Sequence, residues 1–310
     1  MLPDIDEFLL YLQSSNYSAE TVYNYERDLK VFDQFINECH IRFQSVNKKT
    51  IVHYKAYLNS IDRKTPEQAE PTQAISARSV NRMLSALRSY LKFLGEMDYS
   101  CPISPEMVKM AKTERKHPQV AELADLIKLI EAPSSLETNR KVALRNRAIL
   151  EIIFSTGMRI SEVCGLSKSQ IDGTGRIFIM GKGKKQRFVY LTPRAREHLD
   201  RYLAIRNDNV PALFKPYRGR NAADKESRIS TNYVQERIKW YREMLRINLP
   251  TSAHSLRHGF ATYLAEEGAN PAAIQILLGH ESLATTTRYV HPSDRYAEDT
   301  HRRYHPLPNK

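Results

Sequence analysis

A polar stretch bracketed by prolines divides the chain into two parts whose residue patterns differ. Pro102, Pro105 and Pro118 surround the basic segment 112–116. This composition is typical of a linker between domains, and a chain of 310 residues is long enough for about two domains. We therefore expect a domain over residues 1–110, a linker over 111–119, a second domain over 120–292 and a tail over 293–310.

The first part has the periodicity of amphipathic helices. Ser18 is placed to cap a long helix that runs to about Cys39, and a shorter helix is expected near residues 51–60. Ser76 is placed to cap a further helix. The apolar stripe of that helix consists of Val80, Leu84, Leu87, Leu91 and Leu94.

The second part mixes helices with two short strands. Residues 176–180 and 187–191 have the pattern of a β-hairpin with its turn at 181–186. An apolar helix over 143–154 ends at Gly157, and Ser282 is placed to cap a short helix that carries Tyr289. Further helices are expected near 193–206, 231–246, 255–266 and 271–279. These patterns predict a mainly α fold with a small antiparallel β-sheet.

The charge is unevenly distributed along the chain. The net charge is +12, yet residues 1–113 carry equal numbers of basic and acidic side chains, so the excess lies in the remainder. A basic excess favours nucleic acid as a partner, although a solvated cationic face gives the same composition. Within the neutral part, Arg78, Arg82 and Arg88 lie off the apolar stripe with no acidic residue between them. They are candidate DNA contacts.

Several classes of protein are disfavoured. Three widely spaced cysteines, Cys39, Cys101 and Cys164, do not suit a disulfide framework or a zinc cluster and fit a reducing cytosol. The acidic N-terminus and its short apolar run lack the features of a signal peptide or a membrane span. We expect a cytoplasmic protein without a membrane partner.

Two arginine motifs are candidate anion sites. Arg159 follows Gly157 and opens a short helix, where it can bind an anion together with the helix N-terminus or instead pair with Glu162. His254 and Arg257 are three residues apart, so on a helix they share a face and can reach one phosphate. His254 and His258 have a spacing that also suits zinc, but Ser255 stands where a zinc protease needs glutamate.

The predicted hairpin turn is rich in cations. Lys182, Lys184, Lys185 and Arg187 occur with no acid among them, which suits a solvated turn or a turn laid into a DNA groove. The glycine spacing does not match a phosphate-binding P-loop. Cys164 has an apolar setting that indicates packing rather than nucleophilic chemistry.

Taken together and in this order, the motifs resemble the tyrosine recombinase (phage integrase-like) family, and within it the Xer-type recombinases. The resemblance covers essentially the whole chain and is carried by segments 76–88, 156–162, 181–183, 254–258 and 278–280, and by Tyr289, nine residues after His280. It implies a two-domain DNA clamp with an all-helical core-binding domain and an α+β catalytic domain.

The resemblance also implies a role for each motif residue. Arg159 and Arg257 are expected on the scissile phosphate, with His254 and His280 adding hydrogen bonds. Lys182 is expected to protonate the leaving 5′ oxygen, and Tyr289 to be the nucleophile. Because one ester replaces another, the reaction is expected to need no ATP, no metal and no other cofactor.

The implied partners are double-stranded DNA with inverted half-sites and other subunits. The family acts as a homotetramer on two DNA sites, or as a heterotetramer with a paralogue, through a Holliday junction. We expect residues 293–310 to dock on a neighbouring subunit. Chromosome or plasmid dimer resolution, integration of a mobile element, type IB topoisomerase activity and a catalytically silent DNA-binding role are the alternatives that the resemblance leaves.

Overall fold

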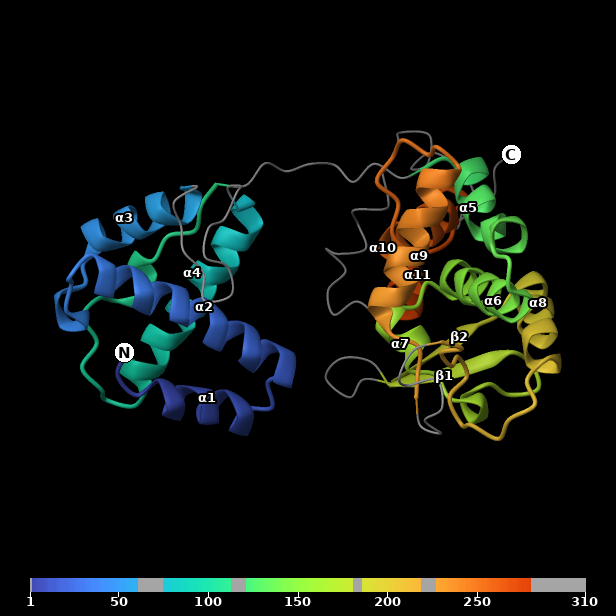
Figure 1. Ribbon diagram of the computed structural model, residues 1–310. Helices are drawn as coiled ribbons and strands as arrows, with labels where there is room; N and C mark the ends of the chain where they lie inside the picture. The colour runs from blue at the N-terminus through green and yellow to red at the C-terminus, as the bar shows by residue number, and fades with distance from the viewer. Residues whose placement is uncertain (1, 61–74, 113–120, 181–185, 219–226, 280–310) are drawn as a thin grey trace, which may run out of the picture. The chain divides into compact units, whose positions relative to one another are not determined.

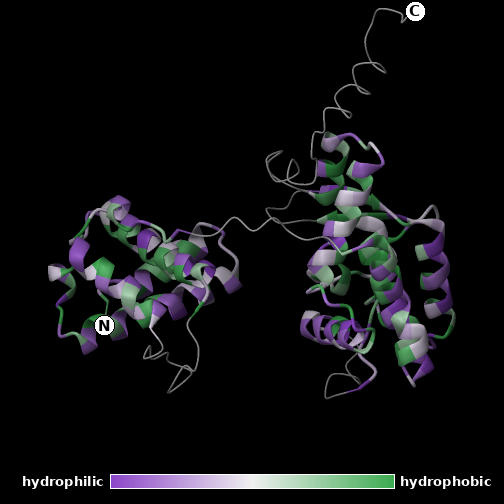
Figure 2. Cartoon of the chain, turned by 90° about the horizontal axis from the view of Figure 1, so that it is seen from above, coloured by the Kyte–Doolittle hydropathy of each residue, from purple (hydrophilic) through white to green (hydrophobic). Residues whose placement is uncertain are grey.

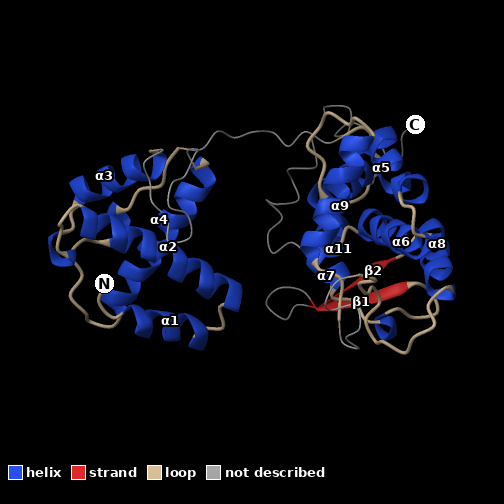
Figure 3. Cartoon of the chain, in the orientation of Figure 1, coloured by secondary structure: helices blue, strands red, loops and turns tan. Residues whose placement is uncertain are grey.

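The chain forms two compact units, residues 1–117 and 118–310, in the computed structural model (Figure 1). The structure describes residues 2–60, 75–112, 121–180, 186–218 and 227–279. The described part is predominantly helical, with one two-stranded antiparallel sheet, as the sequence predicts (Figure 3). No helix within these ranges has the length and apolar character needed to cross a membrane.

The N-terminal unit consists of helices that begin at side-chain caps. The hydroxyl oxygens of Ser18 and Ser76 accept hydrogen bonds from the backbone of the first turns of α2 and α4, as predicted. Asn47 caps α3, which therefore begins earlier than the apolar periodicity suggests. The elements are α1 (Ile5–Ser14), α2 (Ala19–Glu38), η1 (Phe43–Ser45), α3 (Lys48–Asn59), α4 (Ala77–Glu96) and η2 (Pro105–Met107).

Helix α4 supplies much of the core of this unit. All five residues of its predicted apolar stripe are buried, and the helix packs against α1, α2 and α3. Hydrophobic and hydrophilic residues therefore occupy different faces of the helices, as Figure 2 illustrates. Helix α1, which the sequence reading did not predict, contributes Phe8 and Leu12 to the same core.

The C-terminal unit is built around α6. This helix carries buried residues around most of its circumference and packs against α5, α8 and α10. The elements are α5 (Leu123–Leu136), α6 (Arg140–Thr156), α7 (Ile160–Cys164), η3 (Lys168–Gln170), β1 (Arg176–Met180), β2 (Gln186–Tyr190), α8 (Pro193–Ala204), α9 (Thr231–Met244), α10 (Ala253–Glu266) and α11 (Pro271–Leu278). Helix α5 was not predicted, and α10 begins two residues earlier than expected, so His254 lies in its first turn.

The two strands pair in antiparallel register. Arg176 faces Tyr190 and Phe178 faces Phe188 across the ladder. Side chains of β2 alternate between the two faces, so Arg187 and Val189 are buried while Phe188 and Tyr190 are exposed. The turn that joins the strands lies outside the described residues.

Candidate active site

A left-handed glycine turn places Arg159. Gly157 ends α6 with a φ of 63°, and a Cβ at this position would lie 2.4 Å from a ring carbon of Phe260. Position 157 therefore requires glycine, because the backbone is left-handed and a side chain would clash with Phe260. The turn brings Arg159 to the N-cap position of α7.

Glu162 holds Arg159 through both its main chain and its side chain. The Arg159 backbone N–H donates to Glu162 Oε2 at 2.8 Å, and Arg159 Nη1 donates to Glu162 Oε1 at 3.0 Å. The pairing with Glu162 that the sequence allowed is therefore present. The Arg159 side chain is still 39% exposed. Its guanidinium has five N–H groups and makes two hydrogen bonds to described residues, so it can donate further bonds to a ligand.

Arg187 lies in the interior, which differs from its expected place on a basic turn that faces solvent or a DNA groove. Its side chain is 6% exposed and forms a bidentate pair with Glu162. Nη1 donates to Oε1 at 2.9 Å and Nη2 to Oε2 at 2.7 Å, while Nε donates to the Leu277 carbonyl at 3.0 Å. The reason is strand alternation, because position 187 shares the inner face of β2 with Val189.

Arg257 is buried where α10 meets the two turns. Its Nη1 donates to the Gly157 carbonyl at 2.6 Å and its Nη2 to the Leu278 carbonyl at 2.8 Å. His254, one turn earlier on the same helix, is exposed, and its ring lies 5.5 Å from that of His258 in an edge-on arrangement. The predicted helical spacing of His254 and Arg257 is confirmed, since both lie on α10.

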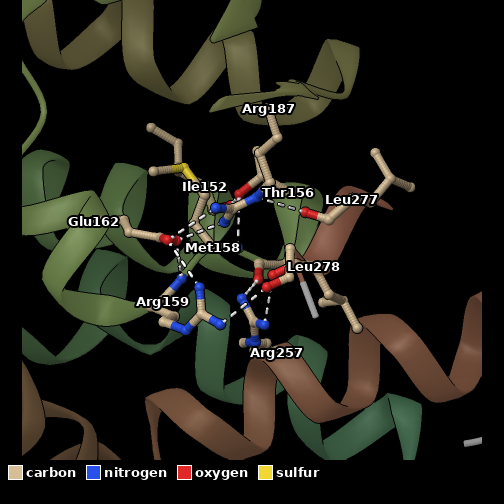
Figure 4. Close-up of polar contacts among 11 residues, drawn as sticks. Ile152, Thr156, Met158, Arg159, Glu162, Arg187, Arg257, Leu277 and Leu278 are labelled. Carbon is tan, nitrogen blue, oxygen red and sulfur yellow. Dashed lines mark hydrogen bonds and ion pairs between the residues drawn. The ribbon is translucent and has the colours of Figure 1, made fainter. Parts of the chain in front are cut away.

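Three arginines meet at the C-terminal end of α11. The carbonyls of Leu277, Leu278 and Gly279 accept hydrogen bonds from Arg187, Arg257 and Arg159, respectively (Figure 4). The last carbonyls of a helix have no intrahelical partner and carry the negative end of the helix dipole, so cations are favoured there. The end of α11 is thereby bonded to α7, β2 and α10, and the next residue in the chain is His280.

The cluster is strongly cationic despite its carboxylate. Three guanidinium groups and one carboxylate, Glu162, leave a net charge of +2 on these four side chains. Burial acts to raise the pKa of Glu162, but hydrogen bonds from Arg187 and from the Arg159 backbone outweigh it and lower that pKa. Glu162 is therefore ionised at neutral pH, and the cluster has capacity for an anion.

The other predicted site residues lie outside the described residues, are exposed, or have partners within the protein. Lys182, Lys184, Lys185, His280 and Tyr289 lie outside the described residues, as does the predicted tail. In the N-terminal unit Arg78 is exposed, as a DNA contact requires. Arg82 Nη1 instead donates to Asp28 Oδ2 at 2.6 Å, and Arg88 Nε donates to the Pro105 carbonyl at 3.1 Å.

Neither the zinc alternative nor a reactive cysteine is supported by the described part of the fold. No group of three potential metal-ligating side chains gathers anywhere in the described ranges. Cys164 is 5% exposed, and burial raises the pKa of its thiol to about 12. The packing role predicted for this thiol is confirmed.

Two residues of this cluster, Glu162 and Arg187, are not among the active-site residues that the motifs predict. The sequence predicts Glu162 as an alternative partner of Arg159, and Arg187 as a cation that faces solvent or DNA. The available signals were the three-residue spacing from Arg159 to Glu162 and the alternation that pairs position 187 with Val189.

Sequence comparison assigns the chain to a family. The phage integrase family model matches residues 120–295, and a model of the phage integrase N-terminal SAM-like domain matches residues 5–96. The chain belongs to the phage integrase family of tyrosine recombinases. It is therefore a tyrosine-type site-specific recombinase, and the family resemblance read from the motifs is confirmed.

Xer recombinases are among its relatives. Tyrosine recombinase XerC of Natranaerobius thermophilus is 32% identical over 316 residues, which covers 99% of each chain. Tyrosine recombinase XerD of Staphylococcus haemolyticus is 29% identical over 313 residues, covering 97% of this chain and 98% of the relative. The likeness thus spans both units of the chain.

Solved structures share the fold. XerH recombinase in a post-cleavage complex with palindromic difH substrate aligns with a TM-score of 0.75 at 20% identity, covering 96% of this chain and 93% of XerH. A lambda integrase dimer bound to a COC′ core site aligns with a TM-score of 0.68 at 16% identity, covering 99% of this chain and 78% of the integrase. The helical N-terminal domain and α+β catalytic domain expected from the sequence are those of this fold.

Proposed function

We propose that this recombinase cleaves and rejoins double-stranded DNA through a 3′-phosphotyrosyl intermediate formed by Tyr289. The observation that carries the proposal is the convergence of Arg159 and Arg257 on the end of α11, with the chain continuing directly into His280. A phosphodiester gains negative charge in the transition state of phosphoryl transfer. A preformed cluster of net charge +2 stabilises that charge without a reorganisation of solvent.

Each site residue has a chemical role in this proposal. Arg159 and Arg257 bind the non-bridging oxygens, and His254 and His280 donate further hydrogen bonds to them. The Tyr289 oxygen attacks phosphorus, its proton passes to solvent or a neighbouring base, and the bond from phosphorus to the 5′ oxygen breaks. Lys182 gives a proton to that 5′ oxygen. A 5′-hydroxyl from a second strand reverses the step, so neither ATP nor a metal is consumed.

The biological setting that the relatives suggest is Xer-type resolution of chromosome or plasmid dimers. XerC and XerD proteins resemble this chain over nearly its full length. The corresponding assembly is a tetramer on two duplexes with inverted half-sites, formed by this chain alone or with a paralogue, and it passes through a Holliday junction. Integration of a mobile element uses the same chemistry and is the second candidate.

Trapping of the covalent intermediate tests the chemistry. A duplex nicked beside the cleavage position loses the released fragment, so the wild-type protein should accumulate a 3′-linked adduct, in EDTA as well as in magnesium. Tyr289→Phe should bind the same DNA and form no adduct, because it lacks the attacking oxygen. An adduct that maps to another tyrosine, or cleavage that requires magnesium, would contradict the proposal.

The cleavage site itself comes from footprinting the protein on chromosomal fragments of its host. Protection over two inverted half-sites near the replication terminus would fit dimer resolution. Protection at the ends of a mobile element would favour the integrase reading instead.

A further inference from the structure

Arg187 joins three parts of the catalytic unit that are distant in sequence. Its main chain belongs to β2, its Nη1 and Nη2 donate to Glu162 of α7, and its Nε donates to Leu277 at the end of α11. Each of these bonds uses a different N–H of one planar guanidinium. A group held at three points in this way has little freedom to move.

Glu162 transmits this restraint to Arg159. Oε1 accepts from Nη1 of both arginines, and Oε2 accepts from Nη2 of Arg187 and from the backbone N–H of Arg159. The carboxylate is 10% exposed, so few waters can replace a lost donor. Its orientation therefore depends on Arg187 on one side and sets the position of Arg159 on the other.

Gly279 lies close against the Arg187 side chain. A Cβ built on Gly279 would lie 3.1 Å from both Cδ and Nη1 of Arg187. Gly279 adopts a φ of 63° and also offers its carbonyl to Arg159 Nη2 at 3.3 Å. Gly279, at the end of α11, thus leaves little room for a larger residue beside Arg187.

We infer that Arg187 is a positioning residue for strand cleavage. It fixes the Glu162 carboxylate and the end of α11 so that the Arg159 guanidinium meets the scissile phosphate in a reactive orientation. Arg187 does not touch DNA in this scheme. The inference rests on the proposed function. Only a buried Arg187 can perform this task, because a side chain surrounded by solvent would not fix the position of Glu162.

Lysine cannot replace this arginine. Its ammonium is a single point, so it can neutralise Glu162 but cannot hold both carboxylate oxygens and the Leu277 carbonyl together. Arg187→Lys therefore preserves the net charge of the cluster but loses the bidentate bond to Glu162 and the bond to Leu277. This variant is the main test, because the retained counter-charge protects the fold.

The experiment measures single-turnover adduct formation on the nicked duplex at saturating DNA, with the full-length chain. Arg187→Lys should bind DNA as the wild type does and cleave on the order of 10²-fold more slowly, the usual cost of a misplacement of about 1 Å. Arg176→Met is the matched control. Arg176 lies on the paired strand, is half exposed and pairs with Asp172, so its loss should leave the rate unchanged.

A double-mutant cycle separates positioning from general destabilisation. If Arg187 acts through Arg159, Arg187→Lys should have no further effect on the residual rate of Arg159→Ala. The defect should also shrink on a substrate whose scissile phosphate is a neutral methylphosphonate, because that group needs less charge stabilisation. A defect that only reflects a poorer fold would persist in the Arg159→Ala background and on the methylphosphonate substrate.

The outcomes are distinct. A folded Arg187→Lys variant that cleaves within about twofold of wild type, or whose defect is the same in the Arg159→Ala background, overturns the inference. Absence of an adduct from wild type and from Arg176→Met overturns the proposed function instead. Circular dichroism and thermal melting measure the folded fraction of every variant, and each cleavage rate is divided by that fraction.

Discussion

Two buried carboxylates, one in each unit, respond to burial in opposite ways. Asp28 of the N-terminal unit is 1% exposed and has one ion pair, from Arg82 Nη1 to Oδ2 at 2.6 Å. Its Oδ1 has no hydrogen-bond partner among the described residues. Burial raises the pKa of Asp28 to about 6, against the lowering effect of Arg82.

Glu162 of the catalytic unit is largely buried, with 10% of its side chain exposed, but it accepts four hydrogen bonds. Both oxygens accept two hydrogen bonds each, from two arginines and one backbone amide. The pKa of Glu162 is lowered, although burial acts to raise it. The comparison shows that the number of donors, rather than burial itself, decides whether a buried carboxylate favours its charged form.

The difference has a functional meaning. In the catalytic unit the carboxylate stays ionised and keeps two arginines in place, as the proposed binding of a phosphate by Arg159 requires. In the N-terminal unit Oδ1 of Asp28 lacks a partner, so the single bond from Arg82 does not offset the cost of burying the charge. The predictions below test this contrast.

The largest effect is expected from Glu162→Ala. This change leaves the Arg187 guanidinium, 6% exposed, without its counter-charge. Breaking a buried pair in this way costs about 3–5 kcal/mol. Urea unfolding followed by fluorescence measures the loss in this unit, because Trp240 of α9 is the single tryptophan of the chain.

Glu197→Ala is the matched control for that measurement. Glu197 pairs with Arg201 on the surface of α8, and both side chains are more than half exposed. Its loss should change the unfolding free energy by no more than about 0.5 kcal/mol. If Glu162→Ala cost less than about 1 kcal/mol, the four hydrogen bonds would not be stabilising the site as described.

The second-largest effect is expected from Asp28→Asn, which should stabilise the N-terminal unit against unfolding. Because the folded pKa of Asp28 is about 6 and the ordinary value is 3.8, the ionised group destabilises the N-terminal unit at neutral pH. The asparagine resembles the protonated form, so the unit should gain up to about 3 kcal/mol at pH 7. Hydrogen–deuterium exchange of α2 and α4 peptides compares the two proteins at each pH.

The pH window of this effect follows from the direction of the shift. The contribution of protonated Asp28 to stability is fully present below about pH 4 and is lost as the pH rises to about 6. The two proteins should therefore have equal protection at pH 4 and diverge up to pH 6. Wild-type helices that were better protected than the variant at pH 7 would show that the ion pair with Arg82 outweighs burial.

The smallest effect is expected from Gly279→Ala compared with Gly268→Ala. Both glycines have positive φ, 63° and 84°, so each alanine costs about 1–2 kcal/mol in backbone strain. Only the first new methyl group meets another side chain, Arg187, at 3.1 Å. Adduct formation should fall in Gly279→Ala and stay normal in Gly268→Ala, after both rates are corrected for the folded fraction. Equal rates would mean that Arg187 yields without consequence for the site.

The sequence by itself determined the features that depend on near neighbours in the chain. Ser18 and Ser76 cap their helices, and Gly157 and Gly279 end theirs, because caps are made within one turn. The apolar stripe of α4 follows from a repeat of three and four residues. The order of the motifs was also enough to identify the family.

Tertiary structure alone decided the position and partners of Arg187. Strand alternation says that Arg187 and Val189 share a face, but not that the face with an arginine is buried while Phe188 and Tyr190 are exposed. The partners of Arg187 lie 25 and 90 residues away, at Glu162 and Leu277, so no local pattern could reveal them. Long-range packing outweighed residue polarity here because each of the three guanidinium nitrogens of Arg187 donates to an acceptor, two of them to a carboxylate.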